Sequence, residues 1–116
     1  MGARSRRKGA AGECEAIAKL NEVYGDKTFR SCRSLQAQQG HVSGDTDGPH
    51  WFVEIKRRKR VNMRQALQQA TDKRQEADDT RVPVAFTRND REPWVAVMWM
   101  DDWLELVEDW IARGER

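Results

Sequence analysis

The sequence WFVEIKRRKR, residues 51–60, places groups that can do chemistry inside a short apolar run. If residues 51–56 form a strand, side chains alternate between its two faces, so Glu54 and Lys56 are neighbours on one face. A carboxylate beside an amine on a strand is most often a simple surface ion pair. An isolated E-x-K pattern therefore indicates only an ion pair. Other residues of the chain are needed to show whether it belongs to a functional site.

A second carboxylate stands nine residues earlier, in the turn-rich segment SGDTDGPH. Asp45 follows a glycine, and the turn leads directly into the strand that carries Glu54. Carboxylates that converge from a turn and an adjacent strand can hold Mg²⁺, which binds few protein oxygens and keeps several waters for a phosphate substrate. Lys56 would project beside that ion, where its ammonium group could stabilise an attacking water. Asp47 is the competing candidate, although Asp47-Gly48 is typical of a turn.

The first helix is predicted over residues 10–24 and ends at Gly25. One turn before its apolar residues, Glu13 falls at the start of the face that packs inward. Glu13 is therefore expected on the buried side of the helix, where it could join a site. The apolar stripe that defines this face is Ile17, Leu20 and Tyr24.

Four strands and two further helices are predicted after the first helix. Alternating polarity indicates strands at KTFRSCRSLQ, at residues 51–57, at VPVAF and at WVAVMWM. A helix over residues 62–77, capped by Asn62, presents small residues to the sheet. The last helix is predicted to start with a capping box from Asp102 to Glu105, to bury Trp103, Val107 and Trp110, and to end near Gly114.

The order of these elements, α-β-β-α-β-β-α, predicts an α/β fold in which helices flank one mixed central sheet. A chain of 116 residues suits one domain, predicted over residues 10–116, with residues 1–9 as a basic, mobile N-terminal arm. No internal repeat or linker divides the chain.

Charge is distributed unevenly, although the net charge is only +2. Residues 1–60 hold 13 Lys/Arg against 7 Asp/Glu, whereas residues 61–116 hold 8 against 12. The half that contains the E-x-K pattern is therefore basic. This asymmetry favours a polyanionic partner such as nucleic acid.

The two cysteines and the N-terminal sequence indicate in which cellular compartment the protein is expected. Cys14 and Cys32 match neither a zinc site nor a disulfide framework, so they are predicted to be reduced thiols. The basic start is followed by no apolar segment of the signal-peptide kind, and no apolar run approaches membrane-spanning length. A cytoplasmic protein without membrane partners is therefore expected.

Together these motifs resemble the PD-(D/E)XK nuclease superfamily. The arrangement Asp45…Glu54-Ile55-Lys56 looks like its signature, and RRKGAAGECEAIAKL is similar to the K-G-x-x-G-E-x-E opening helix of Holliday-junction resolvase-like members, many of them phage proteins. The basic run after Lys56, the ALQQA segment and the ending VPVAFTRNDREPWVAVMWMDDWLELV also resemble the phage branch, so the resemblance covers nearly the whole chain. One departure is Gly44, where the signature has proline.

The resemblance implies a restriction-endonuclease-like fold and a role for each matching residue. Asp45 and Glu54 would hold Mg²⁺ or Mn²⁺ together with the main-chain carbonyl of Ile55. Glu13 would be the acidic residue of the first helix that assists them. Lys56 would be the catalytic lysine.

Two positions have competing matches. Gln69 matches the glutamine of the L-x-Q-A segment and is preferred to Gln68 because it directly precedes the alanine; it would orient water or contact the DNA backbone near the site. Asp45 is preferred to Asp47 because its spacing to Glu54 fits the phage pattern.

The cations after Lys56 indicate a surface for DNA. Along the strand, Arg58 and Arg60 continue the face of Glu54, where forked guanidinium donors suit the phosphates that neighbour a scissile bond. Backbone contacts select DNA by shape rather than by sequence. The alternative is a solvated edge that discourages strand pairing. The predicted nucleic-acid-binding residues are Arg6, Arg7, Lys8, Arg30, Arg33, Arg57, Arg58, Lys59 and Arg60.

The resemblance thus predicts a Mg²⁺-dependent, structure-selective endonuclease, a Holliday-junction resolvase that hydrolyses branched or duplex DNA by paired nicks during recombination. Its products would carry a 5′-phosphate and a 3′-hydroxyl, and it would act in the cytoplasm of a bacterium or of a phage-infected host. Two symmetric nicks require two sites, so a homodimer is expected. The alternatives are another structure-specific or nicking endonuclease of the same fold, a non-catalytic nucleic-acid-binding protein, and an interaction protein whose acidic C-terminal half binds a partner.

Overall fold

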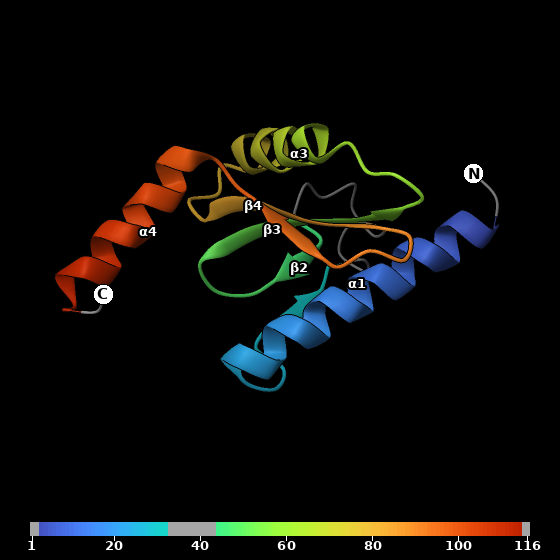
Figure 1. Ribbon diagram of the computed structural model, residues 1–116, viewed down its shortest axis with the longest axis horizontal. Coiled ribbons are helices and arrows are strands. Elements are labelled where there is room, and N and C mark those ends of the chain that lie inside the picture. The colour runs from blue at the N-terminus through green and yellow to red at the C-terminus, as the bar shows by residue number, and fades with distance from the viewer. Residues whose placement is uncertain (1–2, 33–43, 115–116) are drawn as a thin grey trace.

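Three helices and five strands make up the described part of the chain, residues 3–32 and 44–114 of a computed structural model, with side chains described from residue 9 onward (Figure 1). In chain order the elements are α1 (Ala3–Tyr24), β1 (Arg30–Ser31), β2 (Thr46–Asp47), β3 (Trp51–Arg58), α3 (Met63–Glu76), β4 (Val82–Asn89), β5 (Val95–Val97) and α4 (Met100–Ala112).

A mixed three-stranded sheet in the order β3-β4-β5 forms the centre of the fold. β3 and β4 run parallel, with Glu54 opposite Ala85, and α3 makes the crossover that a parallel pair requires. β5 pairs antiparallel with β4. β1 and β2 form a separate antiparallel pair, with Ser31 opposite Thr46. The predicted mixed α/β class is therefore confirmed.

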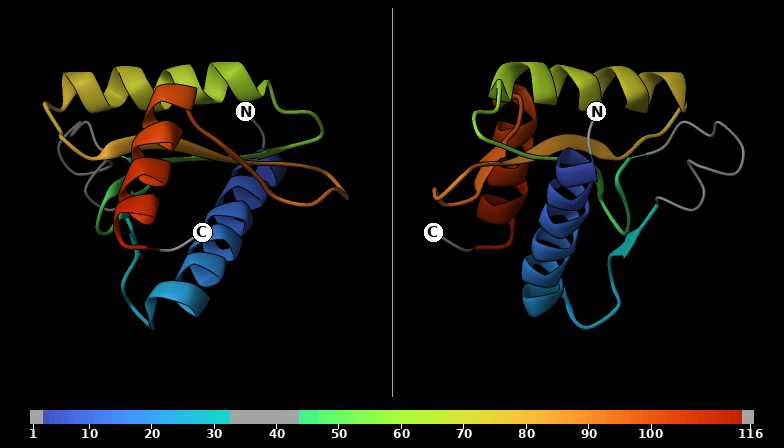
Figure 2. Two further views of the ribbon diagram at one scale, coloured as in Figure 1. Left: turned by 60° about the vertical axis from the view of Figure 1, so that its left-hand side comes forward. Right: turned by 90° about the vertical axis from the view of Figure 1, so that its right-hand side faces the viewer.

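Helices lie on both faces of the three-stranded sheet (Figure 2). On one face α1 crosses β3, where Ala16 packs in a core cluster with Val53. On the other face α3 packs over β4 and β3. The two helices thus hold β3 between them, which fixes the strand that carries the E-x-K residues.

α3 agrees closely with the helix predicted over residues 62–77. Asn62 is its N-cap, and the Asn62 side chain accepts a hydrogen bond from the Gln65 N–H at 3.0 Å, as expected of a capping asparagine. Small side chains on the inward face let the helix approach the sheet closely. Its buried residues are Ala66, Leu67 and Ala70.

α1 is longer than the sequence predicted. It begins at Ala3 rather than at residue 10, so residues 3–9 are helical. Glu13 is 5% exposed, which confirms its predicted position on the inward face. Although α1 has 22 residues, none of the described helices is long and apolar enough to cross a lipid bilayer.

The strands differ from the predictions mainly in length. The strand predicted over residues 27–36 is wrong in extent: among its described residues only Arg30–Ser31 are extended and paired. β2, only two residues long, was not predicted. β4 runs on to Asn89, three residues beyond the VPVAF segment, and β5 is confined to Val95–Val97.

α4 departs from its prediction in both its start and its packing. The helix begins before Asp102 and has no side-chain cap, so the predicted capping box of Asp102 and Glu105 is wrong. The predicted burial of Trp103, Val107 and Trp110 is also wrong, because α4 has no buried residue and both tryptophans are about half-exposed. The helix projects away from the sheet (Figure 1).

Candidate active site

The candidate site lies at the edge of β3 that faces away from β4. Asp45 runs alongside this edge: its N–H donates to the Val53 carbonyl at 2.7 Å, and its Oδ2 accepts from the Ile55 N–H at 2.7 Å. A β-carbon on Gly44 would lie 2.8 Å from the Val53 carbonyl oxygen. This close approach explains the glycine, because the ring of a proline would collide with β3 in the same way.

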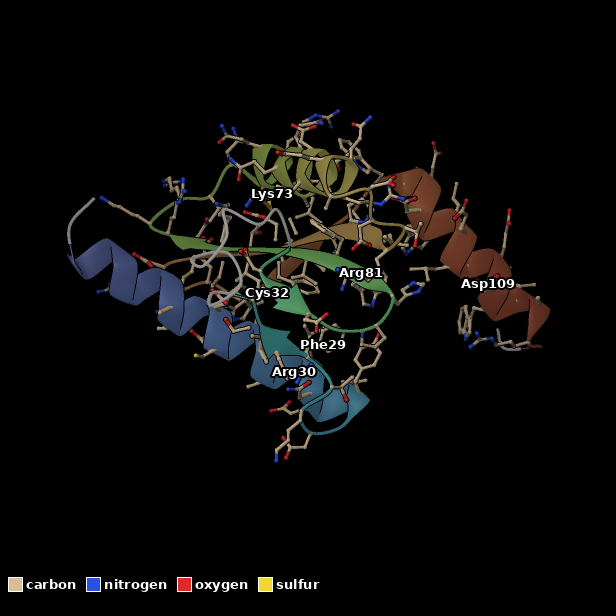
Figure 3. All side chains as sticks on the ribbon, turned by 180° about the vertical axis from the view of Figure 1, so that it is seen from behind. Phe29, Arg30, Cys32, Lys73, Arg81 and Asp109 are labelled. Atoms are coloured by element: carbon tan, nitrogen blue, oxygen red, sulfur yellow. The ribbon has the colours of Figure 1, made fainter. Side chains whose placement is uncertain are left out.

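Glu54 is 1% exposed and lies between two lysines. The Lys73 ammonium is 3.2 Å and 3.0 Å from its two carboxylate oxygens, and the Lys56 ammonium is 3.2 Å from Oε1. Lys73 reaches Glu54 from the side of α3 that faces the sheet (Figure 3). A buried carboxylate is strongly destabilising unless it is paired and hydrogen-bonded, so both lysines support its position.

Glu13 joins this region from α1. Its carboxylate accepts a hydrogen bond from the Ser31 hydroxyl at 2.6 Å, which ties α1 to β1. The Glu13 charge acts on Asp45, as does the charge of Glu54. Two acidic residues that are far from Asp45 in the sequence or on a different element, Glu13 and Glu54, therefore lie close enough for their charges to act on it.

The pKa of Asp45 is raised from 3.8 to about 6, chiefly by burial and then by the negative charge of Glu54. The hydrogen bond from the Ile55 N–H and the charge of Lys73 act in the opposite direction, while Glu13 adds a smaller increase. Among the described residues, three acids and two lysines lie in this region, and both lysines pair with Glu54.

The oxygen donors at this edge suit a hard divalent cation. No three Asp, Glu, His or Cys side chains of the described residues are arranged to hold a metal ion by themselves. Mg²⁺ needs fewer, because it binds one or two carboxylates and keeps several waters. Asp45 and Glu54 supply two carboxylates, and the Ile55 carbonyl points to the same edge as the Ile55 N–H. A divalent ion would offset the negative charge of Glu54, which after burial is the second cause of the raised pKa of Asp45, and two carboxylates with a main-chain carbonyl are a donor set of the kind that Mg²⁺ or Mn²⁺ binds.

Lys73 is the residue of the cluster that sequence reasoning missed. It stands in the last turn of α3, where a lysine is ordinarily explained by the helix dipole. Its spacing was the available signal: Lys73 lies four residues after Gln69 and three after the buried Ala70, on the face that packs on the sheet. Gln69 is half-buried on the same face, whereas Gln68 is exposed and hydrogen-bonds Asp72.

Asp47 lies outside the cluster. Its side chain is 55% exposed and pairs with Arg30 at 3.5 Å and with Arg81 at 3.8 Å. Arg81 also donates to the Gly48 carbonyl at 2.9 Å, so Asp47 belongs to the ion pairs that fix the β2–β3 connection. The preference for Asp45 over Asp47 as a metal ligand stays a prediction.

The predicted DNA-contacting cations have different surroundings. Arg57 packs beneath α1 on the face opposite Glu54, and its guanidinium contacts Glu15 at 3.0 Å, which gives it a structural partner away from the site. Arg30 is exposed beside Asp47. Three cations remain exposed at and just beyond the end of β3: Arg58, Lys59 and Arg60.

The side chains of the other four predicted DNA-contacting residues are not described. Arg6, Arg7 and Lys8 belong to the first turns of α1, where side chains are not described. Arg33 lies outside the described residues.

No family model, curated protein or solved structure matches this chain. The resemblance to nucleases therefore rests on the order of the sequence motifs.

Proposed function

We propose that this protein is a Mg²⁺- or Mn²⁺-dependent DNA endonuclease with a restriction-endonuclease-like fold, selective for branched DNA such as the four-way Holliday junction. The observation that carries the proposal is that two carboxylates, one from α1 and one from β3, act electrostatically on a third at the edge of β3, with a lysine beside the β3 carboxylate. Each residue alone has an ordinary structural explanation, but their meeting at one place does not follow from those explanations. The residues are Glu13, Asp45, Glu54 and Lys56.

Asp45, Glu54 and the Ile55 carbonyl would hold the metal ion, and Glu13 would assist directly or through water. When bound, the ion polarises the scissile phosphate and lowers the pKa of a bound water. The three donors come from β3 and the segment that runs along its edge, so the rigid sheet would fix their positions.

The two lysines would have different tasks. Lys56 continues along β3 and is suited to stabilise the attacking water as it loses its proton and the charge that develops on the phosphate. Lys73 contacts both oxygens of Glu54 and is a positioning residue that orients this carboxylate. Gln69, one turn before Lys73, would orient water or contact the DNA backbone.

DNA would approach along the exposed end of β3. Arg58 lies four residues beyond Glu54 on the same face, roughly 13 Å away at about 3.3 Å per residue, a distance that reaches a phosphate further along the strand. Lys59 and Arg60 line a hollow of about 540 Å³ together with Asp90, Arg91 and Glu92. Such contacts are made to the backbone and would select DNA by shape, which suits a junction of no fixed sequence. The proposal places the protein in the cytoplasm of a bacterium or of a phage-infected host.

The test is cleavage of a labelled four-way junction with Mg²⁺ or Mn²⁺ and, in parallel, with a chelator. We expect the wild type to cut only with metal, and Asp45→Asn, Glu54→Gln and Lys56→Ala to bind the junction without cutting it. Asp47→Asn is the matched control, because it removes an exposed acid two residues from Asp45 and should leave cutting intact. Cutting by all three site variants would refute the assignment.

The substrate class is tested in the same assay with a linear duplex of the same sequence. Preference for the junction supports the resolvase, whereas equal cutting indicates a nicking or restriction-like endonuclease of the same fold. Salt-dependent binding by a wild type that never cuts would instead identify a non-catalytic nucleic-acid-binding protein.

A further inference from the structure

α4 presents an apolar face that nothing in the described structure covers. Apolar side chains recur along it at spacings of three and four residues, which places them on one side of the helix. They are 41–69% exposed, and α4 has no buried residue. The exposed members of this α4 face are Met100, Trp103, Leu104, Trp110 and Ile111.

A matching apolar groove lies on the sheet face that carries α1. The part of this face that β5 forms beside α1 keeps apolar surface exposed, since Val95 is 44% exposed. The groove has a volume of about 280 Å³, and Val23 in its wall is 86% exposed. The lining of this α1–β5 groove comprises Ala16, Lys19, Leu20, Val23, Tyr24, Phe86, Trp94, Val95 and Ala96.

We propose that α4 of one copy docks in the α1–β5 groove of a second copy, and that the exchange is reciprocal, so that the protein forms a two-fold symmetric dimer. Each docked helix completes the layer that α1 leaves unfinished. Charge favours this partner. α4 carries five acids and no base, a charge of −5, which leaves +7 on the rest of the chain, and Lys19 stands in the groove wall.

α4 is held away from the groove of its own copy. Trp99, directly before the helix, donates from its indole N–H to the Thr71 hydroxyl at 2.8 Å and stacks beneath Arg64, so it is anchored on the α3 face of the sheet. The groove lies on the opposite face. Pairing of α4 with α4 of a second copy would bring two helices of charge −5 together, which is unfavourable.

The available surface is large enough for a stable dimer. A tryptophan carries roughly 150–250 Å², so the half-exposed Trp103 and Trp110 together leave roughly 200 Å² bare. With its other members the α4 face reaches the few hundred Å² beyond which soluble monomers rarely expose contiguous apolar surface. A reciprocal exchange covers two α4 faces and two grooves. The total surface area that it buries is therefore on the scale of the roughly 1,200–2,000 Å² buried in stable interfaces.

The test is the mass of the full chain in solution, measured by light scattering and sedimentation without DNA or metal, so that the result is independent of nuclease activity. We expect the wild type at twice the chain mass of 13.5 kDa. The double variant Trp103→Glu/Trp110→Glu and, separately, Val23→Glu should be monomers. These side chains are about half-exposed or more, so circular dichroism should show unchanged folding. Ala112→Glu adds one negative charge to α4 away from its apolar face and should remain a dimer.

Mixing the two monomeric variants gives the sharpest result. One supplies an intact groove and the other an intact α4, so the mixture should form a heterodimer that neither variant forms alone. A monomeric wild type would overturn the proposal. A Val23→Glu dimer would show that the groove is not the docking site, and a dimer of the tryptophan variant would show the same for α4.

Discussion

The ionisation of the Asp45 carboxyl depends on the fold. Burial and the nearby Glu54 raise its pKa to about 6, so the folded protein binds this proton more tightly than the unfolded chain, in which the ordinary value is 3.8. Between these two values the native state holds more protons than the unfolded state. Without metal, the Asp45 carboxyl therefore lowers the stability of the fold as the pH rises from about 4 to above 6.

Asp45→Asn should therefore stabilise the metal-free protein at high pH. Asparagine keeps a side-chain oxygen that can accept from the Ile55 N–H but carries no charge. In a chelating buffer we expect a gain in unfolding free energy on the order of 2 kcal/mol near pH 8 that disappears near pH 4. Urea unfolding at a series of pH values measures it, with Asp47→Asn as the control for loss of an acid outside the cluster. A gain that grows as the pH falls would contradict the expectation.

Lys73 should contribute to stability through Glu54. Lys73→Met leaves a buried carboxylate with Lys56 as its one remaining ammonium partner among the described residues, and we expect a loss of about 2 kcal/mol or more. When Glu54→Gln is also present, that carboxylate is gone and the loss should become much smaller. The coupling is measured by urea unfolding of the four proteins in a double-mutant cycle. Lys59→Met, at an exposed lysine beyond β3, is the control, and additive effects would refute the coupling.

At the scale of elements, periodicity predicted the parts that position the site. The alternation in residues 51–57 gave the correct neighbours on β3, and the stripe on the first helix placed Glu13 on its buried side. The cap at Asn62 could be predicted because its side chain has a hydrogen-bond partner only three residues away, the Gln65 N–H. These features depend on interactions within a few residues of the chain. Local sequence therefore suffices to predict them.

Other elements depend on partners that are distant in sequence. The stripe of α4 showed that one face is apolar, but not that the rest of the chain leaves that face uncovered. β2 is two residues long, too short for a pattern, and exists because it pairs with β1. Lys73 had an adequate local explanation at the end of α3, and only the packing of α3 on β3 brings it to Glu54. For these features the sequence fell short because the deciding contact is tertiary.

At the scale of the whole molecule, the proposed site and the proposed dimer contact occupy different parts of the fold. The carboxylates meet at the free edge of β3, whereas the groove lies between α1 and β5, toward the other edge of the sheet. Each copy in a reciprocal dimer would therefore keep its β3 edge open. One dimer would carry two complete sites, which a junction with two strands to cut requires.

Paired cutting should accordingly depend on the dimer, while single cuts should not. A supercoiled plasmid that extrudes a cruciform is linearised when both strands of the junction are cut in one encounter, and is only nicked when one strand is cut. We expect the wild type to linearise it directly, and Val23→Glu, which alters no residue of the site, to accumulate nicked circles with a several-fold lower ratio of linear to nicked product. Ala112→Glu should behave as the wild type. If monomeric Val23→Glu linearised the plasmid as directly as the dimer, paired cutting would have to arise within a single copy, and the link between the α4 contact and junction resolution would be lost.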